Sequence, residues 1–351
     1  MTQVKAYAAH QADKPLSPYQ IERREPGPFD VEIEILYCGV CHSDIHTARN
    51  EWNGTMYPVV PGHEIVGKVT RIGSGVTQHK VGDTVGVGVF VDSCGHCHSC
   101  EQDLEQYCEN GHSQTYNSFL QDKKTITYGG YSTHIVVTEK FVLKVSDSLP
   151  LEGVAPLLCA GITTYSPLRY WKVKKGDKVG VVGLGGLGHM AVKLASAMGA
   201  EVTMLSRSPQ KAKDAERLGA QHFALTTEKK TMKKLKNTFD LIIDTVSGQH
   251  NYNDYLALLK VDGTMVVLGA PPEPEKVSAS SLIRGRKRLA GSLVGGIKET
   301  QEMLDFCAEH NIVSDVEVIP IDQINEAYER TMKGDVLYRF VIDMASLKQM
   351  T

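Results

Sequence analysis

The sequence predicts an α/β protein in which a β-rich first part is followed by a doubly wound parallel sheet. Beyond about residue 150, apolar strand-like runs alternate with helical runs, as parallel βαβ units require. A glycine turn joins one such strand to its helix within KVGVVGLGGLGHMAVKLASAMGA, residues 178–200. Before residue 150, alternation with a period of two and glycine punctuation predominate instead.

The individual elements follow from these patterns. In the first part, strands are expected in three segments: 31–36 (VEIEIL), 64–72 and 81–89 (VGDTVGVGV). In the second part, further strands are expected at 201–206 (EVTMLS), 239–245 (FDLIIDT) and 263–269 (GTMVVLG), and helices at 209–220 and 252–260 (YNDYLALLK). The stretch APPEPEK is expected to form a loop, because it is rich in proline.

Composition limits the class of protein. The chain has 351 residues, 42% apolar and 23% charged, which is enough for two domains with separate cores. A formal net charge of −3 provides no basic field for a nucleic acid or an anionic membrane, so neither partner is expected. No apolar run reaches the roughly 18 residues of a membrane span, and MTQVKAYAAHQADKPL lacks the features of a signal peptide. A cytoplasmic location is therefore expected.

Four of the eight cysteines lie within residues 92–108, DSCGHCHSCEQDLEQYC. Disulfides, a metal site and chance could each explain the cluster, but structural disulfides are rare in a reducing compartment. The spacing C-x2-C-x2-C-x7-C predicts a tetrahedral structural zinc held by Cys94, Cys97, Cys100 and Cys108. An iron–sulfur cluster remains an alternative. His96 and His98 are expected to face solvent.

The glycine turn matches the G-x-G-x-x-G pattern of dinucleotide-binding sites, because it follows a strand and opens a helix. Its residues are Gly183, Leu184, Gly185, Gly186, Leu187 and Gly188. Without side chains, the backbone can approach a pyrophosphate, and the start of the helix offers free N–H donors. The alternative is a turn that only packs the helix on the strand.

The end of the next strand indicates which dinucleotide is bound. NAD-preferring enzymes place an acidic residue there to bind the ribose hydroxyls. Here the turn instead contains two hydroxyls, a guanidinium and an ammonium, on Ser206, Arg207, Ser208 and Lys211. These groups suit a 2′-phosphate, so the sequence predicts NADP(H). An ordinary solvated basic turn is the alternative.

A second metal site is indicated by three residues in distant segments. Cys41 lies in CGVCHSDIH, His63 in PGHEIVG and Cys159 in LLCAGITTY. Each is unremarkable alone, since a lone cysteine is usually a small core residue. Together they offer two sulfurs and one nitrogen and leave a fourth position open, which is the ligand set of a catalytic zinc. Such a zinc polarises a carbonyl or stabilises an alkoxide.

With these motifs the chain resembles the zinc-dependent medium-chain alcohol dehydrogenases, in particular the cinnamyl-alcohol-dehydrogenase branch and its bacterial NADPH-dependent aldehyde reductases. The resemblance runs through CGVCHSD, YPVVPGHE, VGVGVFVDSC, YGGYS, PLLCAGITTYSPL, GLGGLGH, GSLVGG and ETQEMLDFCAEH in family order. It implies a GroES-like catalytic domain in two pieces, residues 1–152 and 295–351, around a Rossmann domain at 153–294. It also implies two zinc ions per chain, and a homodimer is expected.

The resemblance implies roles for further residues near the catalytic zinc. Ser43 and His46 correspond to the proton relay, and Asp44 to the group that orients His63, with a loop cap as the alternative for Asp44. Glu64 corresponds to a glutamate that either approaches the metal or stays behind its ligands. The expected contacts with the cofactor are made by His42, Thr163, Thr245, Gly269, Ser292, Leu293 and Val294. Cys38 and Cys307 match no ligand position and are expected in the core.

The expected reaction is the zinc-dependent, reversible reduction of aldehydes to primary alcohols. Plant members that form monolignols have a tryptophan soon after the fourth structural cysteine, whereas Cys108 is followed here by ENGHSQTY. With Trp52 as the remaining aromatic wall, we expect a broad reductase of aromatic and medium aliphatic aldehydes. A zinc-free quinone reductase, a polyol dehydrogenase and a nonenzymatic zinc protein are the competing hypotheses.

Overall fold

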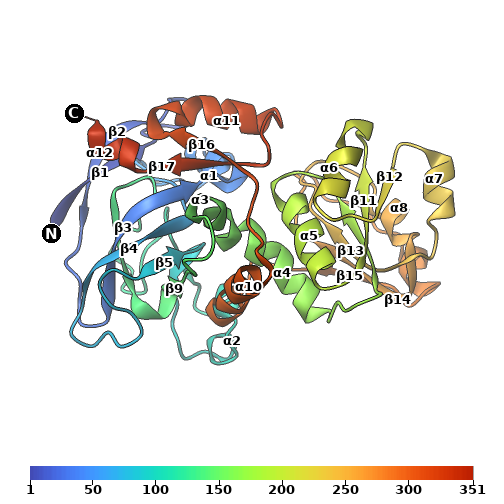
Figure 1. Cartoon of the computed structure of the whole chain (residues 1–351), viewed down its shortest axis with the longest axis horizontal. Coiled ribbons are helices and arrows are strands. Elements are labelled where there is room, and N and C mark those ends of the chain that lie inside the picture. Colours follow the sequence, from blue (N-terminus) through green and yellow to red (C-terminus); the bar gives the residue numbers. More distant parts are fainter. Residues whose placement is uncertain (351) are drawn as a thin grey trace. The chain divides into compact units, whose positions relative to one another are not determined.

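A computed structural model describes residues 1–350, which form two compact units. One unit comprises residues 1–159 together with the chain from residue 295 onward, and the other comprises residues 160–294. The second unit therefore interrupts the first along the chain (Figure 1). The limits expected from the sequence place the start of the inserted domain at 153, whereas the compact unit starts at Ala160.

The inserted unit is built on a six-stranded parallel sheet in the order β12-β11-β10-β13-β14-β15. Its strands are β10 (Lys178–Val182), β11 (Glu201–Ser206), β12 (His222–Leu225), β13 (Phe239–Asp244), β14 (Leu259–Val267) and β15 (Arg288–Gly291). The two central strands, β10 and β13, are almost entirely buried, and they are apolar except for Lys178, Asp240 and Asp244. This is the doubly wound Rossmann arrangement that the sequence predicts.

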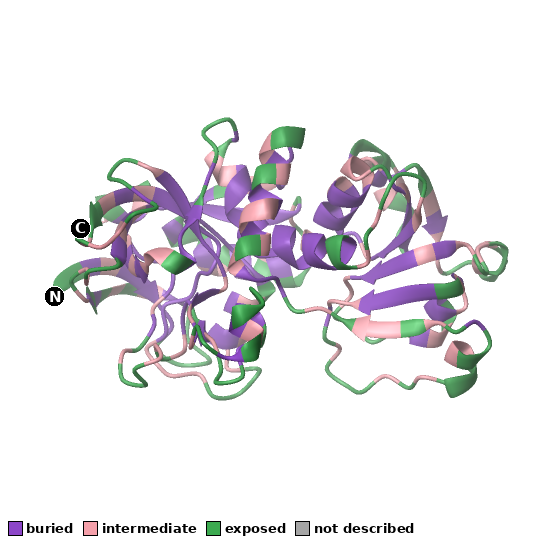
Figure 2. Cartoon of the chain, turned by 90° about the horizontal axis from the view of Figure 1, so that it is seen from below, coloured by how far each residue is buried: buried purple, intermediate pink, exposed green. Residues whose placement is uncertain are grey.

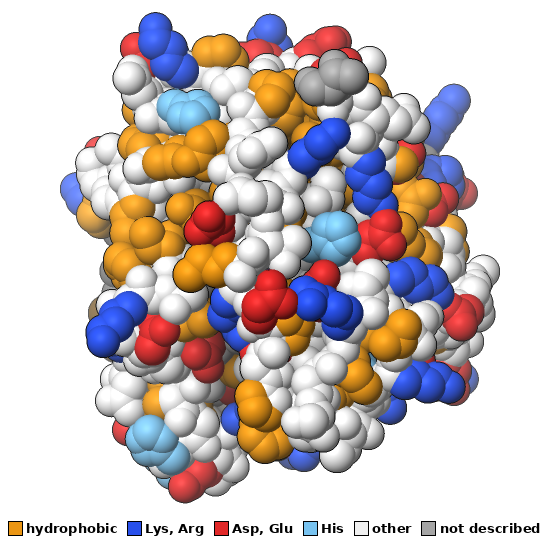
Figure 3. Space-filling view, turned by 90° about the vertical axis from the view of Figure 1, so that its left-hand side faces the viewer, with side chains coloured by type: hydrophobic (Ala, Val, Ile, Leu, Met, Phe, Trp, Pro, Cys, Tyr) orange, Lys and Arg blue, Asp and Glu red, His pale blue; other side chains and the backbone are white. Residues whose placement is uncertain are grey.

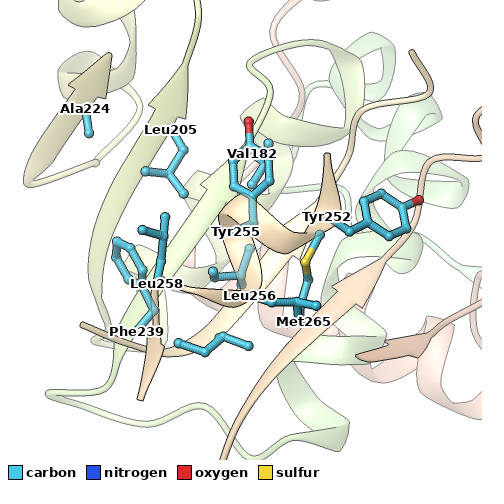
Figure 4. Close-up of a cluster of buried hydrophobic side chains, with 11 residues drawn as sticks. Val182, Leu205, Ala224, Phe239, Tyr252, Tyr255, Leu256, Leu258 and Met265 are labelled. Atoms are coloured by element: carbon cyan, nitrogen blue, oxygen red, sulfur yellow. The ribbon is translucent and has the colours of Figure 1, made fainter. Parts of the chain in front are cut away.

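Helices connect these strands (Figure 1). They are α5 (Gly186–Ala197), α6 (Ala212–Arg217), α7 (Lys229–Lys234), α8 (Tyr252–Leu256) and α9 (Ala279–Ile283), with a 3₁₀ turn η4 (Pro209–Lys211) before α6, whereas α4 (Ala160–Tyr170) precedes the first strand. Figure 4 shows the buried cluster that joins α8 to the strands, including Leu205, Phe239, Tyr255 and Met265. Burial of these side chains fixes α8 on the sheet.

The prediction of a helix over 252–260 is wrong at its end. The helix stops at Leu256, and Leu259 and Lys260 already belong to β14. Leu259 fits the helical spacing of apolar residues, but it pairs with Phe239 of the neighbouring strand instead. Tertiary pairing therefore overrides the local pattern. The helix expected over 209–220 is also shorter, because its start is the 3₁₀ turn and α6 ends at Arg217.

The first unit contains a seven-stranded sheet in the order β16-β17-β3-β4-β5-β9, with β8 also paired to β3. Its strands are β3 (Asp30–Gly39), β4 (Ile65–Ile72), β5 (Thr84–Val87), β8 (His134–Thr138), β9 (Leu143–Lys144), β16 (Val316–Pro320) and β17 (Arg339–Asp343). Strand β17 pairs antiparallel with β3, so the end of the chain completes a sheet begun near its start. The sequence predicts all three of β3, β4 and β5; the prediction for β4 differs by one residue at its start, and those for β3 and β5 differ by up to three residues at an end.

Further strands and helices complete this unit. They are β1 (Thr2–Ala8), β2 (Ser17–Arg23), α1 (His42–Ala48), β6 (Phe90–Asp92), α2 (His98–Glu101), η1 (Glu105–Tyr107), β7 (Ser113–Gln114), η2 (Glu139–Phe141), α3 (Leu151–Val154), η3 (Ala155–Leu158), α10 (Ile297–His310), η5 (Ile321–Gln323), α11 (Ile324–Met332) and α12 (Ala345–Gln349). In Figure 2 the buried residues lie mainly along the strands and on the inner sides of the helices. None of the helices described between residues 1 and 350 is both long and apolar enough to cross a bilayer.

Charges of both signs are mixed on one face of the molecule. On the face seen in Figure 3, lysines and arginines stand beside aspartates and glutamates rather than in a block of one sign. This distribution agrees with the formal net charge of −3. Such a face does not produce the single-sign field that attracts a polyanion.

Candidate active site and zinc-binding loop

A buried group of metal-binding side chains lies in the first unit. One ligand atom from each of Cys41, His63, Glu64 and Cys159 lies within 4.8 Å of all the others. The Sγ atoms of Cys41 and Cys159 are 3.8 Å apart. A disulfide would need about 2.05 Å, whereas two sulfurs bound to one tetrahedral zinc are separated by about 3.8 Å. The geometry therefore fits a shared metal ion.

The residues of this group come from the ends of regular elements. Cys41 precedes α1, at the end of β3, and its backbone N–H donates to Asp44 Oδ2 at 2.8 Å. His63 and Glu64 directly precede β4, and Cys159 follows η3. The paired strands β3 and β4 thus position Cys41, His63 and Glu64.

Asp44 orients the histidine ligand. Its carboxylate is fully buried, and Oδ1 accepts from His63 Nδ1 at 3.1 Å and from the Gly62 backbone at 3.0 Å. A carboxylate can only accept, so Nδ1 has the proton and Nε2 is left free to bind a metal. Burial alone would lower the pKa of His63, but the charge and hydrogen bond of Asp44 raise it well above its usual value. Asp44 therefore fixes the orientation of the His63 ring.

Glu64 is held by an arginine that the sequence analysis did not identify. Arg339 on β17 donates from Nη2 to Glu64 Oε1 at 2.5 Å, and both side chains are almost completely buried. Burial raises the pKa of Glu64 to about 7, although the charge of Arg339 opposes the shift. The other oxygen, Oε2, is buried and has no hydrogen-bond partner among the described residues. This free acceptor, together with two thiols and an imidazole, fits a zinc site.

A signal for Arg339 exists in the sequence. The residue interrupts the apolar run VLYRFVID, and a charged residue inside a buried strand needs a charged or polar partner. That partner, Glu64, is 275 positions away in the chain. The pairing is therefore visible only in the folded structure.

The remaining residues of the expected relay lie on α1 and just after it. Ser43 Oγ lies 3.7 Å from Cys41 Sγ, next to the metal ligands. His46 Nδ1 lies 2.5 Å from Glu51 Oε2, and the His46 ring stacks against Trp52 with centroids 4.9 Å apart. Trp52 is 60% exposed and His42 is also exposed. Helix α1 therefore starts beside the buried ligand Cys41 and carries His46, whose side chain is partly exposed to solvent.

The four-cysteine loop forms a second, closed metal site. The Sγ atoms of Cys94, Cys97, Cys100 and Cys108 all lie within 4.8 Å of one another. The Sγ pairs of Cys94 with Cys100 and of Cys97 with Cys108 are each separated by 4.0 Å, which excludes disulfides in this arrangement. Four thiols fill a tetrahedral shell, so the site has a structural role. His96 and His98 are exposed, as expected.

The same loop caps a helix from the end of the chain. Glu105 is buried, and its Oε2 accepts from the backbone N–H of Ile297, the first residue of α10, at 3.1 Å. Lys298 pairs with Asp103 at 3.1 Å. A carboxylate at a helix N-terminus satisfies a free N–H group and interacts favourably with the helix dipole. The loop therefore connects the first and last segments of this unit.

In the inserted unit, the glycine turn has the backbone that nucleotide binding requires. Gly183 has a φ of +87°, which favours glycine, and Gly185 precedes the first residue of α5. A Cβ on Gly188 would lie 1.9 Å from the carbonyl oxygen of Gly183, so only glycine allows this close packing. Thr245 Oγ1 donates to the carbonyls of Val182 and Gly183 at 2.8 and 3.1 Å, and thereby secures the turn.

The polar side chains in the turn after β11 differ in how far they are exposed to solvent. Ser206 is buried, and its Oγ accepts from the Ser208 backbone at 3.1 Å, which shapes the turn. Arg207 and Ser208 are exposed, and Lys211 is partly exposed. The other expected cofactor residues differ in exposure, since Thr163 and Val294 are buried and Leu293 is 50% exposed. Cys38 and Cys307 are fully buried, as expected of core thiols.

Comparisons with known proteins identify the family. The zinc-binding dehydrogenase family matches residues 186–309, and the alcohol dehydrogenase GroES-like domain matches residues 27–147. The NADP-dependent alcohol dehydrogenase C 1 of Mycolicibacterium smegmatis is 57% identical over 349 residues, which cover 99% of this chain and 100% of that protein. The aldehyde reductase YahK of Escherichia coli is 55% identical over 346 residues, covering 98% and 99%.

A solved structure agrees with these matches. The cinnamyl alcohol dehydrogenase of Helicobacter pylori, in complex with NADP(H), is 45% identical and superimposes with a TM-score of 0.91 over 98% of this chain and 99% of that chain. The chain belongs to the zinc-dependent medium-chain alcohol dehydrogenases. The predicted family, fold and class of enzyme are confirmed, as are two zinc sites per chain.

Mutation of the two metal sites should separate their roles. Cys100→Ser should lower the thermal unfolding midpoint, because structural zinc contributes folding free energy. The matched change Cys41→Ser should abolish turnover and leave the fold intact. Each variant should retain about one of two zinc ions, measured by elemental analysis beside calorimetry. An unchanged midpoint for Cys100→Ser would contradict the structural role.

The buried pair gives a second prediction. Arg339→Met should lower the free energy of unfolding by about 3–5 kcal/mol, because it leaves the Glu64 carboxylate buried without the guanidinium that pairs with its Oε1. Combining it with Glu64→Gln should recover part of the loss. Denaturant unfolding of the zinc-loaded single and double variants measures both effects. The explanation fails if the double variant is as unstable as the sum of the two single variants.

Proposed function

We propose that this chain reduces aldehydes to primary alcohols with NADPH, reversibly and with zinc. The observation that carries the proposal is the buried group of Cys41, His63, Glu64 and Cys159. Cys41, His63 and Cys159 would hold the zinc, and Glu64 is placed to offer its free Oε2 as a further ligand. Zinc at this site would polarise a carbonyl oxygen, and NADPH would supply the hydride.

The chain's own residues supply the proton. Reduction adds a hydride to the carbonyl carbon and leaves a charge on the oxygen, which must be protonated. We assign this transfer to Ser43, with His46 as the group that exchanges protons with solvent. The position of Ser43 beside Cys41, and the exposed edge of α1 at His46, support the assignment. Asp44 fixes His63 and takes no part in proton transfer.

The cofactor is NADP(H) rather than NAD(H). The glycine turn 183–188 lies at the carboxyl end of β10, where a pyrophosphate binds in this fold. The 2′-phosphate is assigned to Ser206, Arg207, Ser208 and Lys211, because the turn has exposed cationic and hydroxyl groups and no carboxylate. We assign further contacts to His42, Thr163, Thr245, Gly269 and the segment 292–294. The sequences related to this chain include NADP-dependent enzymes at 57% identity.

The proposed substrates are aromatic and medium aliphatic aldehydes. Trp52 provides an exposed aromatic surface next to His46. The segment after Cys108 contains no tryptophan, and its aromatic residue, Tyr116, is buried with its ring 5.8 Å from the ring of His63. We further propose that the enzyme works as a homodimer in the cytoplasm. Eight cysteines without disulfides among the described residues support a reducing location.

A substrate panel tests the activity. Benzaldehyde, cinnamaldehyde, a medium aliphatic aldehyde, a ketone, mannitol and a quinone should be compared by kcat/KM at neutral pH, with NADPH absorbance as the signal. Aldehydes should rank first, and ketones should be poor substrates. A preference for mannitol or secondary alcohols would instead favour a polyol dehydrogenase. Absence of turnover with the zinc-loaded protein would refute enzymatic function.

A double variant tests the cofactor assignment. Ser206→Asp with Arg207→Gln should weaken NADPH binding by about 1.5–3 kcal/mol for each lost or repelled contact, and improve NADH relative to NADPH. Lys178→Gln is the matched control, because Lys178 lies at the amino end of β10, and the glycine turn follows the carboxyl end of that strand. Dissociation constants for NADPH and NADH measure the change. An unchanged ratio between the two cofactors would refute the phosphate site.

A further inference from the structure

A fully buried carboxylate stands at the carboxyl end of β13. Asp244 is the last residue of that strand and is 0% exposed. It belongs to the inserted unit, whereas both groups of metal-binding residues belong to the first unit. Its Oδ1 accepts from the Val246 backbone at 3.2 Å, and its Oδ2 lies 2.8 Å from His250 Nε2. A buried carboxylate needs such partners, and the histidine is the one that can bear a charge.

Both ring nitrogens of His250 have acceptors. Nδ1 lies 2.7 Å from the carbonyl oxygen of Gly248, and Nε2 faces the Asp244 carboxylate. A carbonyl oxygen can only accept, so Nδ1 donates, and a charged Asp244 then requires a donor at Nε2 as well. The imidazolium satisfies both bonds. The hydrogen bond with Asp244 is the main reason why the pKa of His250 is raised.

The other groups that face His250 are consistent with this charge. Glu275 Oε1 accepts from the His250 backbone at 2.9 Å. The rings of Tyr252 and Tyr255 lie 5.1 and 5.6 Å from the imidazole, both in edge-on orientation. Burial raises the pKa of each of these tyrosines, so they stay neutral around the histidine.

The segment that His250 secures packs on the glycine turn. A Cβ on Gly183 would lie 2.6 Å from Val246 Cγ2, and a Cβ on Gly269 would lie 2.3 Å from the Val246 carbonyl oxygen. Thr245 donates to Gly183 O at 3.1 Å. Movement of residues 245–248 would therefore disturb both the glycine turn and the segment after β14.

The aromatic neighbours of His250 extend this support. Tyr252 and Tyr255 belong to the buried cluster that also contains Val182 and Leu205, at the ends of β10 and β11 (Figure 4). Those two strands lead directly into the glycine turn and into the turn with Arg207. His250 thus contacts two tyrosines of the buried cluster that packs under both turns.

We propose that His250 is a positioning residue for NADP(H), which through its bonds to Asp244 and Gly248 holds residues 245–248 against the glycine turn. The proposal rests on the cofactor assignment made above and adds a residue that need not touch the cofactor. It predicts a change in cofactor affinity rather than in the chemical step.

The pH dependence has a defined sign. Because the pKa of His250 is raised in the folded protein, its two bonds are present below that value. As the pH rises through the raised pKa, the ring loses its second proton, and the neutral imidazole can donate only one of the two bonds. NADPH affinity should therefore fall as the pH rises, and a side chain that cannot titrate should not show this component.

Three variants test the proposal. His250→Ala removes both bonds, whereas His250→Gln keeps an amide donor that does not titrate. His222→Gln is the matched control, because His222 pairs with Glu201 at 2.9 Å in the same unit, at the amino ends of β12 and β11. NADPH dissociation constants and steady-state kinetics should be measured between about pH 7 and 9.5.

The expected results are specific. His250→Ala should raise the dissociation constant and the KM for NADPH by about five- to tenfold, with kcat at saturating NADPH within about twofold of the wild type. His250→Gln should be intermediate and should lack the wild-type loss of affinity at high pH. His222→Gln should follow the wild type. If His250→Ala does not fold, the pH profile of His250→Gln decides.

Three results would each overturn the proposal. They are an unchanged NADPH dissociation constant in His250→Ala, identical pH profiles for His250→Gln and the wild type, and a fall in kcat with constant KM. Failure of the cofactor assignment is distinguishable, because the wild-type protein itself would then bind NADPH no more tightly than NADH.

Discussion

Burial of charge around the thiols of Cys41 and Cys159 is the constraint on which the first unit depends. Ionised groups in an apolar interior are tolerated only when each has a partner. Asp44 satisfies His63 and two backbone N–H groups, and Arg339 neutralises Glu64. Because Arg339 lies on β17, the site is complete only when the last strand joins the sheet. The chemistry and the closure of the fold therefore depend on the same ion pair.

The four-cysteine loop has a parallel structural effect at another point of the same unit. Its zinc-binding thiols give a short segment, with little apolar surface of its own, a fixed shape. That shape presents Glu105 to the first turn of α10 and Asp103 to Lys298. A metal centre with no open coordination position thus contributes by anchoring a helix from the far end of the chain.

The sequence predicts most of the site because metal ligands and glycine turns depend on residue types at short spacings. Cys94 to Cys108 and Gly183 to Gly188 are of this kind. Arg339 was missed because its partner is distant in the chain, so that only its position in an apolar run marks it. The helix end at Leu256 was misplaced for a related reason, since the pairing of Leu259 with Phe239 is a tertiary effect.

Each unit contains a histidine held by a fully buried aspartate, and the surroundings determine what each pair does. His63 bonds to Asp44 through Nδ1, and its other nitrogen is left for a metal among two thiols. His250 bonds to Asp244 through Nε2, but its Nδ1 is already occupied by the Gly248 carbonyl. With both nitrogens engaged, the second imidazole has no position for a ligand. It can act only on the backbone of residues 245–248, which it holds in place. A histidine–aspartate pair therefore supports metal binding in the first unit and the shape of a loop in the inserted unit.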